Sequence, residues 1–327
     1  MLFHHSLLLL LASAAPLVPA GNYSNPLKDP NGSDPHIVYT DGYYYLTTTT
    51  WTDVQLTRAT TIEGLKTGES KVVWQDSDPS RCCSVWAPEL HEWDGIYLYY
   101  TAGLDGTGDG QRAHVLQGGT NPFDTYTYHG QLSSEWSIDG SIVRFPDGNN
   151  YFVWSCFTGA QSLCIPSMTS PNTLGPTFPL SQPTEPWEIV DTPVNEGPAA
   201  LYHDGNIYIA FSASACWTTS YQLGLLTYLG GDPLQQASWR KTGPHFSSSN
   251  GNFGTAHNGV GLIGFRFFES PDGTEIWNVY HATRIQEGHC GGERYTMLDK
   301  VNWNPDGTPN FGTAQPLGTI QQGPSGE

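Results

Sequence analysis

The sequence predicts an all-β protein, a single five-bladed β-propeller domain over residues 21–327. Three observations carry this prediction: the composition, the lack of helical periodicity, and a repeat marked by Asp-Gly dipeptides. Aromatic residues make up 13% of the 327-residue chain, and 37 glycines and 24 prolines accompany only 13% charged residues. This mixture is typical of short strands joined by tight turns. No segment of useful length shows the hydrophobic periodicity of a helix, which favours an all-β fold.

The repeat consists of Asp-Gly dipeptides, each followed by an aromatic and β-branched run. They begin at Asp41, Asp94, Asp147, Asp204 and Asp272, in steps of 53, 53, 57 and 68 residues. Each one predicts a hairpin turn leading into a strand, and a period of about 50 residues is that of one four-stranded propeller blade. A two-domain β-sandwich would also contain Asp-Gly hairpins, but the similar spacing and strand chemistry favour five blades.

The first 20 residues, MLFHHSLLLLLASAAPLVPA, have the pattern of a secretory signal peptide, an apolar run followed by small residues. The leucine run is too short to span a bilayer, and no later stretch reaches about 18 consecutive apolar residues. We therefore expect a secreted, extracellular protein with no membrane partner.

Net charge and cysteine content further restrict the class of protein that the sequence can represent. The formal net charge of −18 and the lack of a basic stripe argue against binding to nucleic acid. Six cysteines in a secreted chain predict disulfide bonds. Cys156 and Cys164 flank a short loop and can form a bridge. The adjacent Cys82 and Cys83 can pair with each other in a vicinal ring or with separate partners.

Four acidic residues occupy a similar phase of the repeat, near the start of the strand that precedes each Asp-Gly turn: Asp34, Glu89, Asp139 and Glu196. This strand is expected to line the central channel of a propeller, so its first residues face one mouth of that channel. Converging carboxylates and partial desolvation raise pKa values, an arrangement typical of functional sites. The alternative to a functional role is that these side chains cap turns or accept hydrogen bonds from backbone amides at the rim. This alternative is strongest for Glu89, which lies within a Trp-Ala-Pro-Glu run.

Two carboxyl groups with different pKa values in one pocket suit glycoside hydrolysis. One must be protonated to assist the leaving oxygen, and another must be ionised to activate water or to attack the sugar. A third acid nearby keeps the general acid protonated and orients the sugar or its neighbour. The fifth repeat supplies His257 in place of an acid. A neutral imidazole there can hold a cation or ordered water, with a simple hydrogen-bonding role as the alternative.

The segments GSDPHIVYTDGYYYLTTT, SVWAPELHEWDGIYLYYTAG, SIDGSIVRF and NEGPAALYHDGNIYIAFSAS resemble, in this order and spacing, the glycoside hydrolase family 43 enzymes. The resemblance runs from about Gly32 to the closing VNWNPDGTPNFGTAQPLG. It implies a five-bladed propeller and an inverting enzyme that acts on arabinose- and xylose-containing plant polysaccharides. It further implies that Asp34 is the general base, Asp139 the pKa modulator and orienter, and Glu196 the general acid.

The same resemblance implies roles around the acids. His257 resembles the channel histidine of the family, which approaches a bound calcium or sodium ion, and no cofactor is implied for the chemistry itself. Trp86 is expected to face the sugar, and Arg294 and Glu89 are expected to contribute polar contacts near it. Core packing of Trp86 and a salt bridge of Arg294 at the rim are the alternatives.

The closing NWNPDGTPNFGTAQPLG resembles the extracellular α-L-arabinofuranosidases of the family, and no C-terminal β-sandwich typical of its β-xylosidases follows the fifth repeat. These features imply release of L-arabinofuranose from arabinan or arabinoxylan of plant cell walls, with exo action on α-1,5-linked arabinan. We expect the protein to be a monomer. An endo-1,5-α-L-arabinanase or a β-xylosidase of the same family would use the same acids. A non-catalytic sugar-binding propeller is the alternative of another class, but its pockets would repeat between blades rather than share one funnel.

Overall fold

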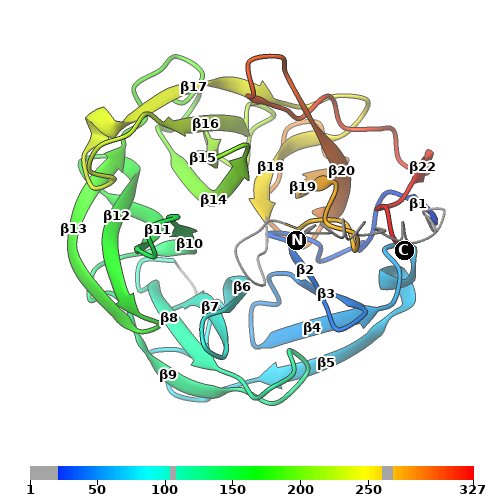
Figure 1. Ribbon diagram of the computed structural model, residues 1–327, viewed down its shortest axis with the longest axis horizontal. Coiled ribbons are helices and arrows are strands. Elements are labelled where there is room, and N and C mark those ends of the chain that lie inside the picture. The colour runs from blue at the N-terminus through cyan, green and yellow to red at the C-terminus, as the bar shows by residue number, and fades with distance from the viewer. Residues whose placement is uncertain (1–20, 104–107, 260–267) are drawn as a thin grey trace, which may run out of the picture.

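The computed structural model describes residues 21–103, 108–259 and 268–327, and its five four-stranded antiparallel sheets confirm the predicted propeller (Figure 1). Blade 1 contains β2 (His36–Thr40), β3 (Tyr43–Thr47), β4 (Val54–Ala59) and β5 (Glu69–Trp74). Blade 2 contains β6 (Trp86–Glu92), β7 (Ile96–Ala102), β8 (Arg112–Gln117) and β9 (Thr127–Gln131). Blade 3 contains β10 (Ile138–Arg144), β11 (Asn150–Phe157), β12 (Gln161–Ser170) and β13 (Thr173–Ser181).

The remaining elements complete the ring. Blade 4 contains β14 (Asn195–His203), β15 (Asn206–Ala213), β16 (Gln222–Tyr228) and β17 (Trp239–Phe246). Blade 5 contains β18 (Phe253–Gly259), β19 (Ile276–Thr283), β20 (Tyr295–Trp303) and β21 (Pro309–Asn310). Two short 3₁₀ helices, η1 (Glu63–Thr67) and η2 (Gln236–Ser238), follow β4 and precede β17. The predicted signal peptide, residues 1–20, lies outside the described residues.

The first strand of every blade is the innermost one, as the repeat predicts. The strands β2, β6, β10, β14 and β18 contact one another in a closed ring around the channel. All five Asp-Gly dipeptides lie between the first and second strands of a blade. In the β2–β3 turn, Asp41 and Gly42 have φ values of 51° and 78°, the left-handed pair that a two-residue hairpin of type I′ requires.

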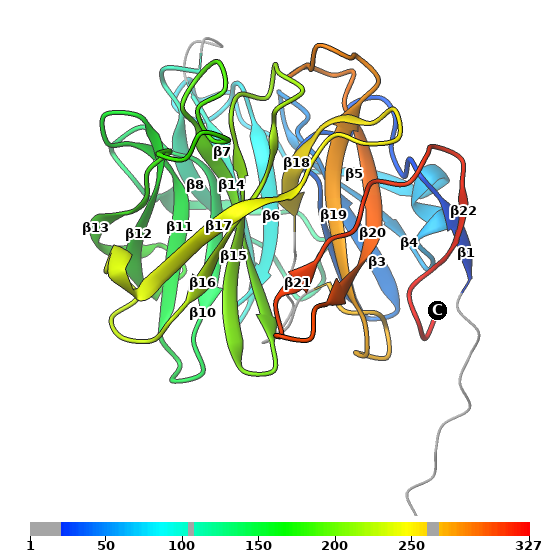
Figure 2. The ribbon, with the colours of Figure 1, turned by 90° about the horizontal axis from the view of Figure 1, so that it is seen from above.

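Strand direction therefore places two kinds of connection on opposite faces of the propeller (Figure 2). One face carries the Asp-Gly turns, and we call it the turn face. The second strand of each blade runs back from the turn face, so the connection to the third strand lies on the other face, which we call the pocket face. These second-to-third-strand connections differ in length and sequence from blade to blade.

The apolar core consists of clusters that lie between neighbouring blades. In β7, Leu98 and Tyr100 pack toward blade 1, whereas Tyr97 and Tyr99 pack toward blade 3. Side chains alternate between the two faces of a strand, so β7 is buried against a neighbouring blade on each of its two faces. This double burial explains why the run after each Asp-Gly turn is almost continuously apolar and aromatic.

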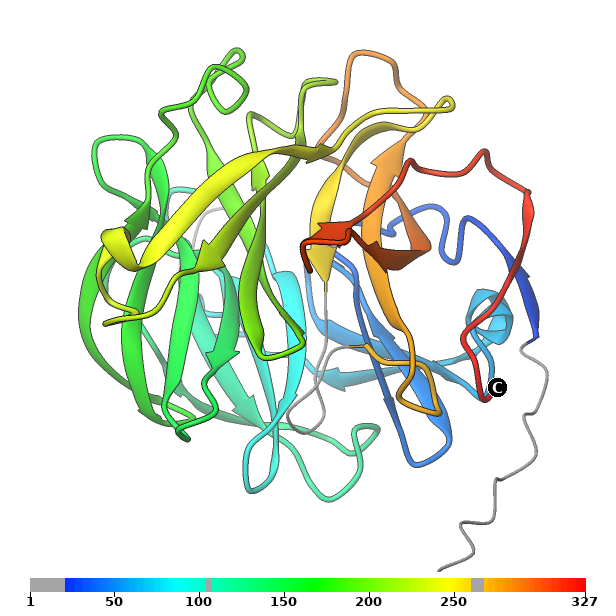
Figure 3. The same cartoon turned by 45° about the horizontal axis from the view of Figure 1, so that its top comes forward.

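The two ends of the described chain lie side by side at the rim of the propeller. Strand β1 (Asn22–Ser24) pairs with β22 (Ile320–Gln322) at the rim (Figure 3). The hydroxyl of Tyr23 donates to the carbonyl oxygen of Leu298 at 2.7 Å, which ties the start of the domain to blade 5. In the described part of the chain, no helix is long and apolar enough to cross a membrane.

Three disulfide bonds join all six cysteines. Cys156–Cys164 crosses the β11–β12 hairpin, as the short loop between them predicts. Cys82 and Cys83 pair with each other, one of the two arrangements that the sequence left open. Cys216–Cys290 joins connections of blades 4 and 5 that are 74 residues apart, a pairing that no spacing rule could have found.

Candidate active site

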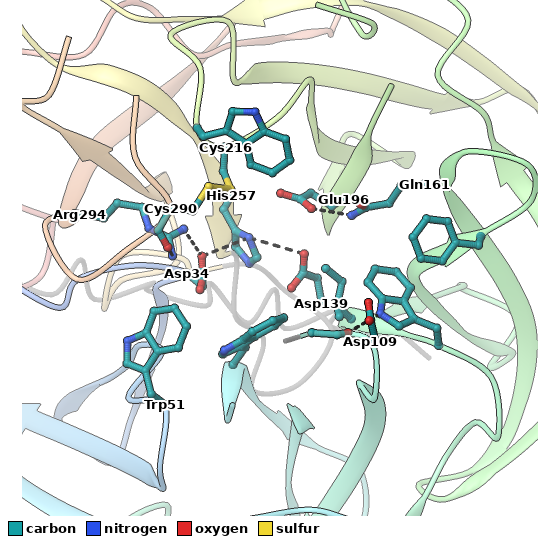
Figure 4. A pocket seen from close by; sticks show the side chains of 16 residues that line it. Asp34, Trp51, Asp109, Asp139, Gln161, Glu196, Cys216, His257, Cys290 and Arg294 are labelled. Carbon is teal, nitrogen blue, oxygen red and sulfur yellow. Dashed lines mark hydrogen bonds and ion pairs between the residues drawn. A yellow bond between two sulfur atoms is a disulfide. The ribbon is translucent and has the colours of Figure 1, made fainter. Parts of the chain in front are cut away.

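A pocket of about 710 Å³ lies at the mouth of the channel on the pocket face (Figure 4). Five of the lining residues lie at the entrances of the first strands: Asp34, Trp86, Asp139, Glu196 and His257. Others lie at second-to-third-strand connections, among them Trp51, Asp109, Phe157, Gln161, Trp217 and Arg294. The structure therefore brings together six of the seven predicted site residues around one pocket.

A left-handed residue at the entrance of each first strand turns the backbone toward the channel. The φ values are 52° for Asp34, 45° for Ala87, 58° for Asp139, 53° for Gly197 and 51° for His257. In four of the five blades the pairing register also shifts at this point, which marks a β-bulge. Positive φ is uncommon outside glycine and is enriched in Asp, Asn and His, so two acids and the histidine suit this backbone.

Glu89 does not lie in the pocket, which corrects the expected contact with substrate. In blade 2 the left-handed entrance position belongs to Ala87, and Glu89 lies two residues further along β6. Its Oε2 atom is 2.8 Å from Nε2 of His91, and burial raises the pKa of Glu89 to about 8. The offset of Glu89 from its Asp-Gly turn, shorter than that of the other acids, was the sign of this difference.

Asp34 is held as a carboxylate by its neighbours. Arg294 donates through Nη1 to Oδ1 of Asp34 at 3.0 Å, and Thr49 donates through Oγ1 to Oδ2 at 2.5 Å. Burial by itself would raise the pKa of Asp34, but Arg294, His257 and His281 together hold it well below its ordinary value. Asp34 is therefore ionised at neutral pH and suited to accept a proton.

Glu196 and Asp139 have the opposite tendency. Burial raises the pKa of Glu196, with a further contribution from the charge of Asp34, although hydrogen bonds from Tyr221 and Gln161 oppose the change. Tyr221 donates to Oε1 of Glu196 and Gln161 donates to Oε2, each at 2.7 Å. Burial and the charge of Glu196 raise the pKa of Asp139 well above its ordinary value. This side of the pocket therefore retains a proton more readily than the side that holds Asp34.

His257 lies between Asp34 and Asp139 (Figure 4). Its Nδ1 atom is 3.5 Å from Oδ1 of Asp34 and 3.8 Å from Oδ2 of Asp139. Burial lowers the pKa of His257, so the ring is neutral at neutral pH. Calcium prefers six to eight oxygen ligands. The described surroundings of His257 offer two carboxylates and no such oxygen cage, so an ion at this position stays a prediction.

A cluster of three potential metal ligands does exist elsewhere in the described residues: His36, Glu89 and His91. Two of its members already bond to each other, through Nε2 of His91 and Oε2 of Glu89. The backbone N–H of Leu90 approaches Nδ1 of His36 at 3.5 Å. This cluster is separate from the pocket and does not include His257.

Arg294 and Trp86 line the pocket as the sequence predicts. Nη2 of Arg294 donates to the carbonyl oxygen of Cys290 at 2.6 Å, so the Cys216–Cys290 disulfide holds the loop that positions the guanidinium beside Asp34. The Trp86 ring meets the ring of Trp51 edge-on, with 6.0 Å between centroids. The two rings form an aromatic wall next to Asp34.

Apart from Arg294, the pocket residues on the second-to-third-strand connections were not predicted from the sequence, because the repeated acids mark the first strands alone. A usable signal was present. Trp51 and Phe157 each lie ten residues after the aspartate of their Asp-Gly dipeptide, at or beyond the end of the second strand, which returns to the pocket face. Gln161 follows in the same hairpin as Phe157, and Tyr221 ends the corresponding connection of blade 4.

Comparison with known families identifies the family of the chain. The profile described as "Glycosyl hydrolases family 43" matches residues 23–309. The chain belongs to glycosyl hydrolase family 43. This match confirms the resemblance that the four sequence segments indicated.

The family-43 relatives include named arabinofuranosidases. The chain is 36% identical to the extracellular exo-α-(1→5)-L-arabinofuranosidase of Streptomyces avermitilis, over 92% of this chain and 65% of that protein. It is 35% identical to α-L-arabinofuranosidase 43 of Humicola insolens, over 94% of this chain and 66% of that protein. The chain thus spans about two thirds of the length of these two relatives.

Among solved structures, an α-L-arabinofuranosidase from Lactobacillus brevis superposes with a TM-score of 0.81 at 30% identity. The superposition covers 91% of this chain and 98% of that protein. A family-43 endo-arabinanase from Bacillus licheniformis shares the fold with a TM-score of 0.62, but at 16% identity.

Proposed function

We propose that the protein is a secreted, inverting α-L-arabinofuranosidase that removes single L-arabinofuranose units from α-1,5-linked arabinan or from arabinoxylan of plant cell walls. The observation that supports this most directly is the opposite tendency of two acids in one pocket. Asp34 is held ionised, whereas burial and neighbouring charge favour protonated Glu196. The names of the relatives from Streptomyces avermitilis and Humicola insolens support the choice of sugar.

In the proposed reaction, Asp34 takes a proton from a water molecule. The oxygen of that water attacks the anomeric carbon on the face opposite the leaving oxygen. Glu196 donates its proton to the leaving oxygen as the glycosidic bond breaks. The products are arabinose of inverted anomeric configuration and a polymer shortened by one unit. Asp34 ends protonated and Glu196 ionised, and exchange of one proton with solvent restores both.

The surrounding residues support these two steps. Asp139 accepts a hydrogen bond from the backbone N–H of Gly197 at 3.1 Å, which fixes its carboxyl group next to Glu196. In our proposal Asp139 keeps the pKa of the acid high and orients the sugar. Trp86 packs against the sugar, and Arg294 keeps Asp34 ionised. No step needs a metal ion or another cofactor.

Secretion and a monomeric state are part of the proposal. The first 20 residues have the pattern of a signal peptide, and relatives from Streptomyces avermitilis and Streptomyces chartreusis are named extracellular. The partner is the polysaccharide itself, which reaches the acids through the open mouth of the pocket.

The deciding experiment is analysis of the first products from linear arabinan, branched arabinan and arabinoxylan, by chromatography and proton NMR. Arabinose alone from the linear polymer, formed first as the inverted anomer, is the expected result. Arabino-oligosaccharides would point to endo action, and xylose would point to a β-xylosidase. Binding without turnover would favour a non-catalytic propeller, and retained configuration would contradict the role of Asp34.

A further inference from the structure

We propose that Phe157 and Trp136 form the subsite for the sugar on the leaving side of the scissile bond, which we call the acceptor subsite. Its ligand is the sugar ring that departs with the rest of the polysaccharide, which is an arabinofuranosyl ring in α-1,5-linked arabinan. This inference rests on the proposed hydrolase function and goes beyond it, since it assigns a direction to the bound polysaccharide.

The direction follows from the positions of the two acids. In an inverting displacement the base and the acid act from opposite sides of the sugar ring, and the acid must reach the leaving oxygen. Asp34 lies with Arg294 and the Cys216–Cys290 disulfide on one side of the pocket, and Glu196 lies with Gln161 on the other (Figure 4). The leaving sugar must therefore lie on the side of Glu196.

The wall on that side presents an aromatic surface. Phe157 is 62% exposed, the highest value for an aromatic side chain in the described part of the chain, yet it lines the pocket. Its ring centroid is 4.5 Å from that of Trp136, whose Nε1 atom donates to the carbonyl oxygen of Gly108 at 2.8 Å. An exposed apolar surface at the edge of a polar pocket marks a binding site, and the C–H faces of a sugar ring pack on such rings.

One hairpin links this surface to the acid. Phe157 is the last residue of β11 and pairs with Gln161, the first residue of β12. Gln161 donates to Oε2 of Glu196 at 2.7 Å, and the Cys156–Cys164 disulfide crosses the same hairpin. A sugar packed on Phe157 is therefore held at a fixed position relative to the proton donor, which is what efficient proton transfer requires.

The test compares two substrates that share the donor sugar and need similar protonation of the leaving oxygen: α-1,5-arabinobiose and methyl α-L-arabinofuranoside. Only the first places a sugar ring in the acceptor subsite. For Phe157→Ala we expect kcat/KM on arabinobiose to fall about tenfold, while kcat/KM on the methyl glycoside stays within about twofold of wild type. Phe157→Tyr, which keeps a flat ring, should restore most of the activity on arabinobiose.

Phe178→Ala is the matched control, since Phe178 is a 36% exposed phenylalanine of the same blade that does not line the pocket. It should leave both rates unchanged. If Phe157→Ala lowers kcat/KM equally on both substrates, or on neither, the assignment of the acceptor subsite is wrong. A wild-type protein that releases no arabinose from either substrate would instead refute the proposed function, so the two failures are distinguishable.

Discussion

The two faces of the propeller are built from the ends of the same strands, yet they differ in how strictly they repeat. On the turn face each blade has the same Asp-Gly dipeptide between its first and second strands. On the pocket face the lining residue at the strand entrance is an acid in three blades, Trp86 in blade 2 and His257 in blade 5. Strict repetition here therefore reflects backbone geometry, whereas departures from it mark the site.

Substitutions can test this division, because those on the pocket face should change activity and those on the turn face should change stability. The largest effect is expected for Asp34→Asn. The variant keeps the shape of the side chain but has no group to take a proton from water, and general base catalysis contributes up to about 10⁴-fold. We expect arabinose release to fall by about this factor on every substrate, polymeric or aryl. Activity above about one tenth of wild type, with the thermal unfolding midpoint unchanged, would remove Asp34 from the role of base.

Glu196→Gln should have a large effect that depends on the substrate. Arabinan has a poor leaving group and needs protonation, whereas 4-nitrophenolate leaves with little assistance. We expect a loss of about 10²- to 10³-fold on arabinan and a much smaller loss on 4-nitrophenyl α-L-arabinofuranoside. Steady-state rates on both substrates measure this ratio, and equal losses would show that Glu196 is not the acid.

Gly205→Ala should change stability and leave catalysis alone. Gly205 has a φ of 80° in the Asp-Gly turn of blade 4, and a Cβ atom there would meet nothing within 4 Å. The cost is therefore that of the left-handed backbone, about 1–2 kcal/mol in the free energy of unfolding. Denaturant unfolding measures it, and Gly205→Asn should cost less because asparagine tolerates this conformation. A lower kcat of Gly205→Ala, measured where the variant is fully folded, would show that the two faces are not independent.

Tyr221→Phe should shift the pH profile by a smaller amount. Burial raises the pKa of Glu196, and the hydrogen bond from Tyr221 to its ionised form lowers it, so loss of the hydroxyl should raise the pKa further. Since Glu196 acts in its protonated form, the alkaline limb of kcat/KM should move to higher pH. The acidic limb reports Asp34 and should stay in place. A shift of the alkaline limb to lower pH would contradict this account of the carboxyl group.

Removal of metal ions should have the smallest effect. No proposed step uses an ion, so dialysis against a chelator should leave kcat on arabinan unchanged. Elemental analysis of the protein before dialysis tests whether an ion binds near His257. A loss of activity that calcium restores would show that an ion takes part in the site.

Much of the fold and part of the site could be predicted from residues close together in the sequence. The Asp-Gly turns and the runs after them identified the blades and the inner strands. The phase of Asp34, Asp139 and Glu196 relative to these turns placed them at one mouth. The same reasoning misplaced Glu89, which lies two residues beyond the left-handed entrance position that Ala87 occupies in blade 2, as its shorter offset from the Asp-Gly turn indicated.

The sequence by itself therefore determined the number of blades, the strand that lines the channel and the mouth at which three acids meet. These features depend on turn chemistry and on alternation along a strand, which act between near neighbours. Only the tertiary structure decided how the acids differ. Arg294, which holds Asp34 ionised, is 260 residues away in the chain, and Gln161 and Tyr221 reach Glu196 from two different blades. The pKa values depend on burial and on charges brought close by folding, so no local pattern contains them.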